Sequence, residues 1–448
     1  MTDLREIAQD LVARARRAGA DAADAVLGDS DGLEVGIRLG EVEKLKRSRE
    51  QRAGLRVFVG SATAIASSGD LTAAGLDALV TDAIALARVT APDPHGGLPD
   101  QADVATAIPA LDLYDAAVET MEPAPAFERC RAAEDAARAA SPEITNSEGA
   151  EFGCGGGRVA LATSHGFVGG YASSSFGLSA VPIATRDGQM QRDYWYSSSR
   201  TLDGLEPADA IGREAARRTL RRLGGRRVPT GEYPIVFEPE IAASLLRHLA
   251  GAIAGSALYR RASFLLDSLG ETIAAPGVTV VDDPLRPGGL ASRPFDGEGV
   301  ASARRTIVED GVLRSYFLDS YSARRLGLRT TGHAARSAGD APGVSPTNLY
   351  LEAGPHTPEA IVGSVAKGLY VTELIGFGVN TVTGDYSRGA AGLWIENGEL
   401  THPVEEITIA GNLRDMLRGI SMIGSDLRFR TATASPTLKI ERMTVAGT

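Results

Sequence analysis

Cysteine is scarce in this sequence, and long apolar runs are missing. The 448 residues include only two cysteines, Cys130 and Cys154. This excludes a secreted disulfide framework and favours a reducing cytoplasm. No run of about 18 apolar residues occurs, so we expect no membrane-spanning helix. The first twenty residues are amphipathic and carry Asp3, Glu6 and Asp10, so we expect them to form a helix and not a signal peptide.

Histidine is also sparse, and its spacing excludes the usual helical zinc motif. The closest pair of the six histidines, His333 and His356, is 23 positions apart, so neither HExxH nor HExxxH occurs. Neither cysteine has a histidine nearby in the sequence, so a Cys-His nucleophile pair is not indicated. A zinc site assembled from distant histidines is the remaining alternative. His248 lies within a predicted helix and is expected to be a packed or surface histidine.

Acidic residues outnumber basic ones, 57 to 46, which gives a formal net charge of −11. Such a chain repels the phosphate backbone of nucleic acids, so we expect no direct nucleic-acid partner. Hydrophobic residues make up 43% and charged residues 23%, the composition of a soluble globular protein.

Hydrophobic periodicity alternates between helical and strand spacing along the chain. Asp-Gly or Asn-Gly pairs at 187–188, 310–311 and 397–398 favour tight hairpins. The pattern predicts an α+β fold, with an N-terminal domain of helices and antiparallel sheet at 1–225 and a β-rich C-terminal domain at 226–448. The predicted helices span 3–18, 71–90, 124–140, 207–223 and 239–255, and strands are expected at 32–67, at 143–197 and through the second half.

Three clusters each have a functional and a structural interpretation. The segment Gly153-Cys154-Gly155-Gly156-Gly157 could approach a phosphate, but it lacks the P-loop lysine, and a flexible strand connection is favoured. Seven arginines between 213 and 227 could bind phosphate, but a solvated helix face is favoured. Tyr194-Trp195-Tyr196 alternates as in a strand, so the rings cannot all face one side, and part of this run could contact a peptide.

Polar, glycine-bounded segments of the second half are the remaining candidates for a site. Asp282 and Asp283 precede a proline, Asp296 and Glu298 alternate with glycines, and residues 383–389 form another polar loop. Such loops can hold ligands or can satisfy tight backbone turns, and the residues alone favour neither. The candidates are Asp282, Asp283, Asp296, Glu298, Thr383, Asp385, Ser387 and Arg388.

Several segments of the second half, in the same order, resemble the TldD/PmbA family, once described as modulators of DNA gyrase, and within it the PmbA (TldE) branch. The N-terminal order of helix, strands and helix is also similar, though more loosely. The resembling segments are SALYRRASFLLDSLGETI (256–273), VDDPLRPGGLASRPFDGEG (281–299), GVLRSYFLDSYSARRLGLRTTGHAAR (311–336), TGDYSRGAAGLWIENGELTHPVEEITIAGNL (383–413), IGSDL (423–427) and SPTLKIERMTVAG (435–447).

The resemblance implies a two-subunit peptidase. One branch of the family carries a helical HExxxH zinc motif and a C-terminal cysteine, whereas the other branch lacks both and pairs with it. Counting without gaps from the segment after 255 places Leu246, Arg247 and Gly251 where the motif's histidine, glutamate and second histidine would stand. None of these side chains can donate an electron pair to zinc, and both cysteines lie before residue 155. No catalytic residue and no metal ligand of the family can therefore be placed on this chain.

We therefore expect a non-catalytic subunit of a cytoplasmic peptidase that acts on unfolded or leader peptides. Its partner would be a TldD-like subunit that holds the zinc, and a homodimer would form when the chain is alone. The eight candidate residues named above would form the peptide chamber or the subunit interface, and the peptide would bind by strand addition. Two alternatives stay open: a stand-alone hydrolase with an unrecognised site, and a regulatory protein that affects DNA gyrase.

Overall fold

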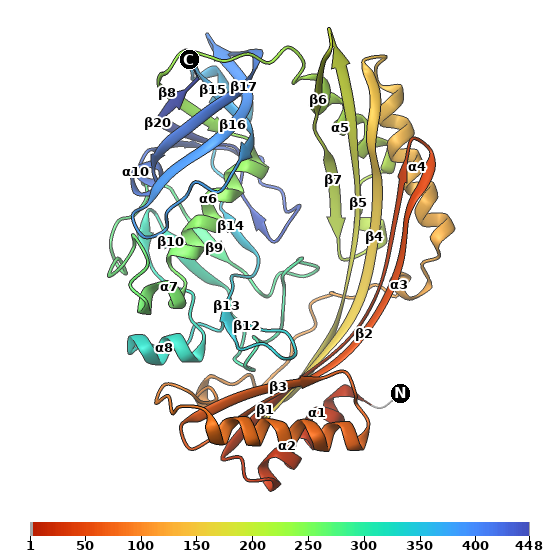
Figure 1. The fold of residues 1–448 in the computed structure, drawn as a ribbon. Helices are drawn as coiled ribbons and strands as arrows, with labels where there is room; N and C mark the ends of the chain where they lie inside the picture. Colours follow the sequence, from red (N-terminus) through yellow and green to blue (C-terminus); the bar gives the residue numbers. More distant parts are fainter. Residues whose placement is uncertain (1–2, 448) are drawn as a thin grey trace.

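Residues 22–199 contribute seven antiparallel strands to one long, curved sheet (Figure 1). The structure is a computed structural model and describes residues 3–447. The strand order is β3-β2-β1-β4-β5-β6, and β7 pairs with β5 as well. The strands are β1 (Ala22–Arg38), β2 (Glu41–Val59), β3 (Ala62–Ser68), β4 (Ile144–Thr163), β5 (Val168–Arg186), β6 (Gln189–Arg192) and β7 (Trp195–Ser199).

Two groups of helices cover one face of this sheet, because side chains alternate along each strand. Odd-numbered residues of β1 from Ala23 to Ile37 point to the helices, whereas Asp24 and Val26 point to the C-terminal half of the chain. The helices α1 (Leu4–Arg17) and α2 (Ala73–Val89) pack at one end of the strands. The helices α3 (Ala117–Thr120), α4 (Pro123–Ala139) and α5 (Ala208–Leu220) pack at the other end, and short 3-10 turns lie at Gln101–Asp103 and Leu202–Gly204.

The C-terminal half contains a second set of strands, several of which close into a ring. The strand order in this set is β17-β16-β15-β8-β20-β18. Because β17 also pairs with β20, the first five strands form a closed ring, and β18 extends the set from β20. A mixed sheet, β11-β10-β9-β14-β19, and the pair β12-β13 lie beside it. The strands are β8 (Gly231–Phe237), β9 (Val280–Asp282), β10 (Arg305–Glu309), β11 (Val312–Leu313), β12 (Ala334–Ala335), β13 (Gly343–Val344), β14 (Leu349–Leu351), β15 (Lys367–Ile375), β16 (Asp385–Glu396), β17 (Glu399–Asn412), β18 (Ile420–Ile423), β19 (Thr433–Ala434) and β20 (Leu438–Ala446).

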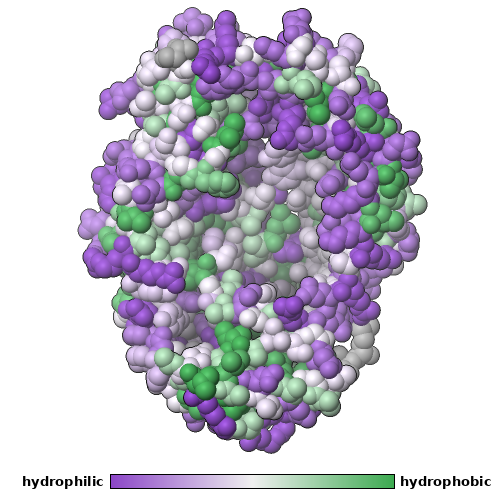
Figure 2. Space-filling view, viewed as in Figure 1, coloured by the Kyte–Doolittle hydropathy of each residue, from purple (hydrophilic) through white to green (hydrophobic). Residues whose placement is uncertain are grey.

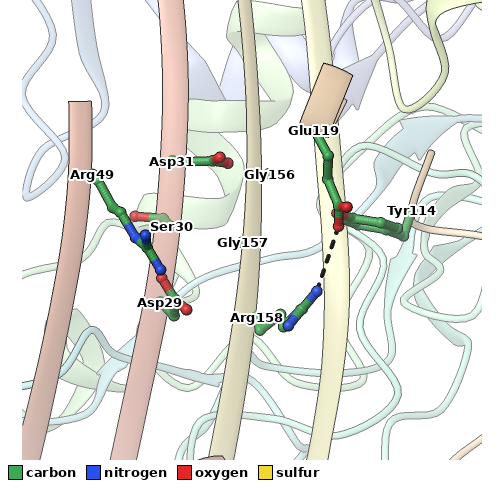
Figure 3. A pocket seen from close by; sticks show the side chains of 9 residues that line it. All are labelled: Asp29, Ser30, Asp31, Arg49, Tyr114, Glu119, Gly156, Gly157 and Arg158. Carbon is green, nitrogen blue, oxygen red and sulfur yellow. Dashed lines mark hydrogen bonds and ion pairs between the residues drawn. The ribbon is translucent and has the colours of Figure 1, made fainter. Parts of the chain in front are cut away.

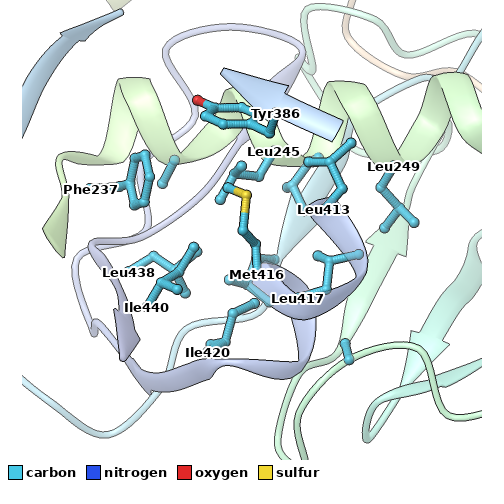
Figure 4. Close-up of a cluster of buried hydrophobic side chains, with 14 of the residues drawn as sticks. Phe237, Leu245, Leu249, Tyr386, Leu413, Met416, Leu417, Ile420, Leu438 and Ile440 are labelled. Carbon is cyan, nitrogen blue, oxygen red and sulfur yellow. The ribbon is translucent and has the colours of Figure 1, made fainter. Parts of the chain in front are cut away.

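The largest core of the molecule lies around α6 in this half (Figure 4). Leu245 and Leu249 of α6 meet Met416 and Leu417 of α10, and Tyr386 of β16 lies over the same cluster. Because Leu246 is only 5% exposed, α6 is fixed by its apolar side. The helices here are α6 (Pro239–Ala252), α7 (Gly255–Tyr259), α8 (Ser320–Leu326), α9 (Pro358–Gly363) and α10 (Leu413–Arg418).

The predicted α+β fold is confirmed, and each of the five predicted helices begins and ends within three residues of its predicted bounds. The hairpins at Asp310-Gly311 and Asn397-Gly398 are also confirmed. The four residues have positive φ values of 46°, 81°, 52° and 80°, as a type I′ turn requires. Within residues 3–447, no helix combines the length and the apolarity needed to cross a bilayer.

Two local predictions are wrong. Residues 153–157 lie in the interior of β4, paired on both sides, and do not connect strands. Residues 385–389 begin β16 and are not a loop, because Tyr386 is buried between the exposed Asp385 and Ser387 in the alternation of a strand.

Candidate functional site: an arginine-lined pocket between the two halves

The face of the molecule shown in Figure 2 is hollowed at its centre, between the N-terminal sheet and the C-terminal half. A pocket of about 270 Å³ lies between the same two walls. One wall carries Tyr194 and Tyr196, at the start of β7, and the other is formed by the polar side of α6. Leu374 of β15, Arg388 of β16 and the segment 428–435 complete the lining.

Helix α6 presents different chemistry on its two sides. Pro239 occupies its first turn, where the missing N–H costs nothing, and Glu240 in the same turn faces the positive end of the helix dipole. The leucines point into the core, whereas Glu240, Ser244 and Arg247 line the pocket. The pocket is therefore a consequence of the amphipathic pattern of this helix.

The position at which the zinc motif is expected lies on this helix. Leu246 is buried in the core, Arg247 is exposed to the pocket, and Gly251 is exposed, with open space where a Cβ would stand. None of these residues offers a donor for Zn²⁺, and the guanidinium of Arg247 would repel it. Nowhere in the described chain do three or more His, Cys, Asp or Glu side chains lie together in a way that could hold a metal ion. The residues at this helix do not fit a zinc ion.

Four arginines reach the pocket, and three of them lack a carboxylate partner within residues 3–447. Arg430 pairs with Glu206 and also lies 3.3 Å from a carboxylate oxygen of Glu240. Arg247 and Arg428 line the pocket without an ion pair. Arg388 makes only a long hydrogen bond of 3.5 Å to the carbonyl oxygen of Leu374, and its Nε is buried without a partner. The pocket thus holds an excess of positive charge.

The electrostatics of the neighbouring groups reflect this excess. Burial, and then the charges of Arg388 and Arg247, lower the pKa of His248 to about 4, so this imidazole is neutral at pH 7. Although Arg247 is exposed to the pocket, partial desolvation by the surrounding walls lowers its pKa as well, and the charge of Arg388 adds to the effect. The Nε2 atom of His248 and the hydroxyl of Tyr386, whose rings lie 6.1 Å apart, are buried without hydrogen-bond partners in the described structure.

The aromatic run divides between the two sides of its strand, as predicted. The rings of Tyr194 and Tyr196 stack with their centroids 6.1 Å apart, and both line the pocket. Trp195 is buried on the other side, with the guanidinium of Arg218 5.0 Å from its ring centroid. β7 pairs with β5 along one edge only, so among the described strands its second edge has no partner.

Three of the eight candidate residues are buried and bonded inside the chain. Asp282 accepts hydrogen bonds from the backbone and the hydroxyl of Thr347 at 2.7 and 2.6 Å. The carboxylate of Asp296 accepts three backbone N–H groups within its own turn and from Ala334. Burial, and then the charge of Glu298, raise the pKa of Asp296. These side chains hold the fold together and do not face the pocket.

Glu298 belongs to a buried ion network that joins the two halves of the chain. Its carboxylate lies 3.2 Å from Arg56 of β2, and Arg56 also contacts Asp24 of β1 at 2.5 Å. Arg336 reaches the second oxygen of Asp24 at 2.8 Å. All four side chains are less than one-tenth exposed. We refer to Asp24, Arg56, Glu298 and Arg336 as the ionic junction.

The remaining candidates lie nearer the surface, and only Arg388 lines the pocket. Thr383 and Asp385 are exposed and bonded to each other, with 2.6 Å between Oγ1 and Oδ2. Ser387 is exposed on β16, and Asp283 caps a turn by accepting the N–H of Leu285 at 3.0 Å. A contact of these residues with a peptide or a partner stays a prediction.

The pocket residues that the sequence did not reveal are Arg428 and Arg430. They belong to no motif, and they lie more than 200 positions along the chain from Tyr194 and Tyr196, which line the same pocket. Tyr194, Tyr196 and Arg247 had each drawn attention separately, but no sequence signal placed them together.

A second hollow of about 220 Å³ lies beside the glycine-rich part of β4 (Figure 3). Asp29, Asp31 and Glu119 line it together with Arg49 and Arg158. Arg158 pairs with Glu119 at 3.4 Å. The three carboxylates that line this hollow would repel an anion, so it gives no support to phosphate binding at residues 153–157.

The arginines between 213 and 227 are mostly neutralised within the chain. Arg218 and Arg221 pair with Glu238 at 2.9 and 3.1 Å, and Arg222 pairs with Glu373 at 2.6 Å. Arg218 is buried, so the expected solvated face is wrong for this part of the helix. These charges join α5 to the C-terminal half.

Comparisons with known proteins match most of this chain to a single family. Models of the three PmbA/TldA metallopeptidase domains match residues 23–87, 117–223 and 230–447. A protein of Escherichia coli O157:H7 named Metalloprotease PmbA is 41% identical over 432 residues, which cover 95% of this chain and 92% of the relative.

Two solved structures share the whole fold. A candidate modulator of DNA gyrase from Bacteroides thetaiotaomicron has a TM-score of 0.92 and 30% identity, and the match covers 100% of both chains. TldE from Thermococcus kodakarensis has a TM-score of 0.88 and 20% identity, covering 98% of this chain and 100% of that one, a likeness of fold alone. The chain therefore belongs to the PmbA/TldD metallopeptidase family, in its PmbA (TldE) branch.

Proposed function

We propose that this chain is the non-catalytic subunit of a cytoplasmic, heteromeric zinc peptidase that processes unfolded or leader peptides. The observation that supports this is the chemistry of α6. At the expected place of the zinc motif the helix offers a buried leucine, an arginine and a glycine, namely Leu246, Arg247 and Gly251. In this proposal a partner of the other branch supplies the zinc ion, and with it the activated water that attacks the peptide bond.

The residues of this chain would bind and orient the peptide. The unpaired edge of β7 offers backbone hydrogen bonds to an extended chain, which suits unfolded substrates of varied sequence. Tyr194 and Tyr196 add a flat surface beside it. No bond-breaking step is assigned to these groups.

The test is to purify the chain alone, a family member with the HExxxH motif alone, and the two together. We expect the two chains to co-elute, and we expect stoichiometric zinc only in samples that contain the partner. Cleavage of an unfolded peptide should require the partner and should stop on chelation. Zinc-dependent cleavage by this chain alone would overturn the proposal.

A control variant of the partner distinguishes formation of the complex from cleavage of the peptide. Replacing the glutamate of the partner's zinc motif should abolish cleavage while the complex still forms. If the two chains never associate, measured by size-exclusion chromatography with light scattering, the proposed subunit role is wrong. The same measurement on this chain alone tests the expected homodimer.

A further inference from the structure

The arginine-lined pocket carries positive charge that this chain does not neutralise. Arg247, Arg388 and Arg428 converge on a space of about 270 Å³ without an ion-pair partner in the described residues. Glu240, the one carboxylate in the lining, lies 3.3 Å from Arg430. Holding like charges together is unfavourable, so a bound anion would stabilise the pocket.

The unpaired cations of the pocket are guanidinium groups, and their geometry indicates the shape of the anion that would bind. A guanidinium is a planar fork that binds a carboxylate through two parallel hydrogen bonds, and it keeps its charge at any physiological pH. Within residues 3–447, the guanidinium of Arg388 donates one long hydrogen bond, 3.5 Å from Nη2 to the carbonyl oxygen of Leu374, so a ligand can supply the acceptors that its terminal N–H groups lack. The pocket is therefore suited to a flat, two-oxygen anion.

The remaining lining favours a peptide as the source of the anion. Tyr194 and Tyr196 present stacked rings beside the unpaired edge of β7, and an extended peptide can use both features. Ligand pockets that enclose a whole drug-sized molecule measure roughly 300–1,000 Å³. At about 270 Å³ this one is suited to one part of a longer chain.

We propose that the pocket formed by Tyr194, Tyr196, Arg247, Arg388 and Arg428 binds a carboxylate group of a peptide and so positions it along β7. This inference rests on the proposed function, because it assigns the holding of peptide to the non-catalytic subunit. The carboxylate is either the free C-terminus or the side chain of an Asp or Glu, and the two sources are separated by experiment.

The probe is a flexible ten-residue peptide with a fluorescent label at its N-terminus and one central Asp. It is prepared with a free or amidated C-terminus, and with Asp or Asn at the central position. Fluorescence anisotropy measures its binding to the full chain alone and to the complex with an inactivated partner. Removing the recognised carboxylate should weaken binding roughly tenfold or more, the effect of losing a charge-assisted hydrogen-bond pair.

Variants of the chain test the pocket directly. Arg247→Gln combined with Arg388→Gln should weaken binding of the charged peptide to a similar extent and should remove the difference between charged and uncharged peptides. Arg428→Gln, on an exposed segment, serves as a second variant that leaves the packing intact. Arg213→Gln is the matched control, since this exposed arginine of α5 pairs with Asp209.

Equal binding of all four peptides to the wild-type chain would overturn the inference. So would unchanged binding in both pocket variants, or displacement by inorganic phosphate but not by a carboxylate peptide. Because these measurements are made on the chain alone as well as on the complex, they are independent of the co-elution and zinc measurements that test the subunit role.

Discussion

Arginine has opposite surroundings in the ionic junction and in the arginine-lined pocket. In the junction, Arg56 and Arg336 are buried, and each guanidinium lies within 3.2 Å of a carboxylate oxygen. In the pocket, Arg247 and Arg428 have no carboxylate partner among residues 3–447. The residue type is the same, but only the junction uses its charge inside the chain.

The paired arginines of the junction stabilise the fold, whereas the unpaired arginines of the pocket are available to bind a ligand. A buried guanidinium without a carboxylate would carry a desolvation cost of several kcal/mol, so the junction must be complete for the two halves to pack. In the pocket, Arg247 and Arg428 are exposed, so water solvates their guanidiniums until an anion replaces it. The following predictions test this comparison.

The largest effect is expected in the junction. Asp24→Asn removes the negative charge between Arg56 and Arg336 and should lower the free energy of unfolding by about 3–5 kcal/mol, as when one partner of a buried ion pair is lost. Urea denaturation measures this. Glu352→Gln is the control, because its pair with Arg304 is about half exposed and should contribute about 1 kcal/mol or less. Equal effects of the two substitutions would contradict the comparison.

A smaller effect concerns the pH dependence of stability near the pocket. The pKa of His248 is lowered to about 4 in the folded chain, whereas an unfolded histidine titrates near its ordinary value of 6.5. The unfolded state therefore binds the proton first as the pH falls, and folded wild type should lose stability between pH 6.5 and about 4. The loss relative to His248→Gln should be about 2 kcal/mol, allowing for partial exposure. Denaturation of both proteins from pH 8 to 4 measures it, and parallel curves would refute the prediction.

The smallest change in the free energy of unfolding is expected for a substitution in the pocket. Arg247→Ala should change the free energy of unfolding by less than about 0.5 kcal/mol, because this side chain makes no ion pair and is exposed. Arg56→Ala is the matched comparison in the junction and should be strongly destabilising. Thermal unfolding of both variants compares them directly. A large loss with Arg247→Ala would mean that Arg247 is needed for the fold, contrary to its unpaired state.

Sequence reasoning identified elements whose signal is local. Helix α6 was predicted from Pro239 onward, and the hairpin at Asn397-Gly398 from two residues. The residues of the site were only partly predictable. Arg388 was among the candidates, but it had been placed on a loop. Asp282, Asp296 and Glu298 were candidates for the chamber or the interface, and the sequence did not reveal that they are buried. An acidic residue next to glycine looks the same in sequence whether its partners are water or a buried arginine.

The sequence alone determined the periodic elements, the α+β class and the lack of zinc donors at positions 246, 247 and 251, because each depends on residue type and short spacing. The tertiary structure decided which charges are neutralised. Arg56 meets Glu298 across 242 positions, whereas Arg428 lines the same pocket as Tyr196 and forms no ion pair within residues 3–447. Coulomb energy depends on distance in space and on burial, and neither is fixed until the two halves of the chain have packed together.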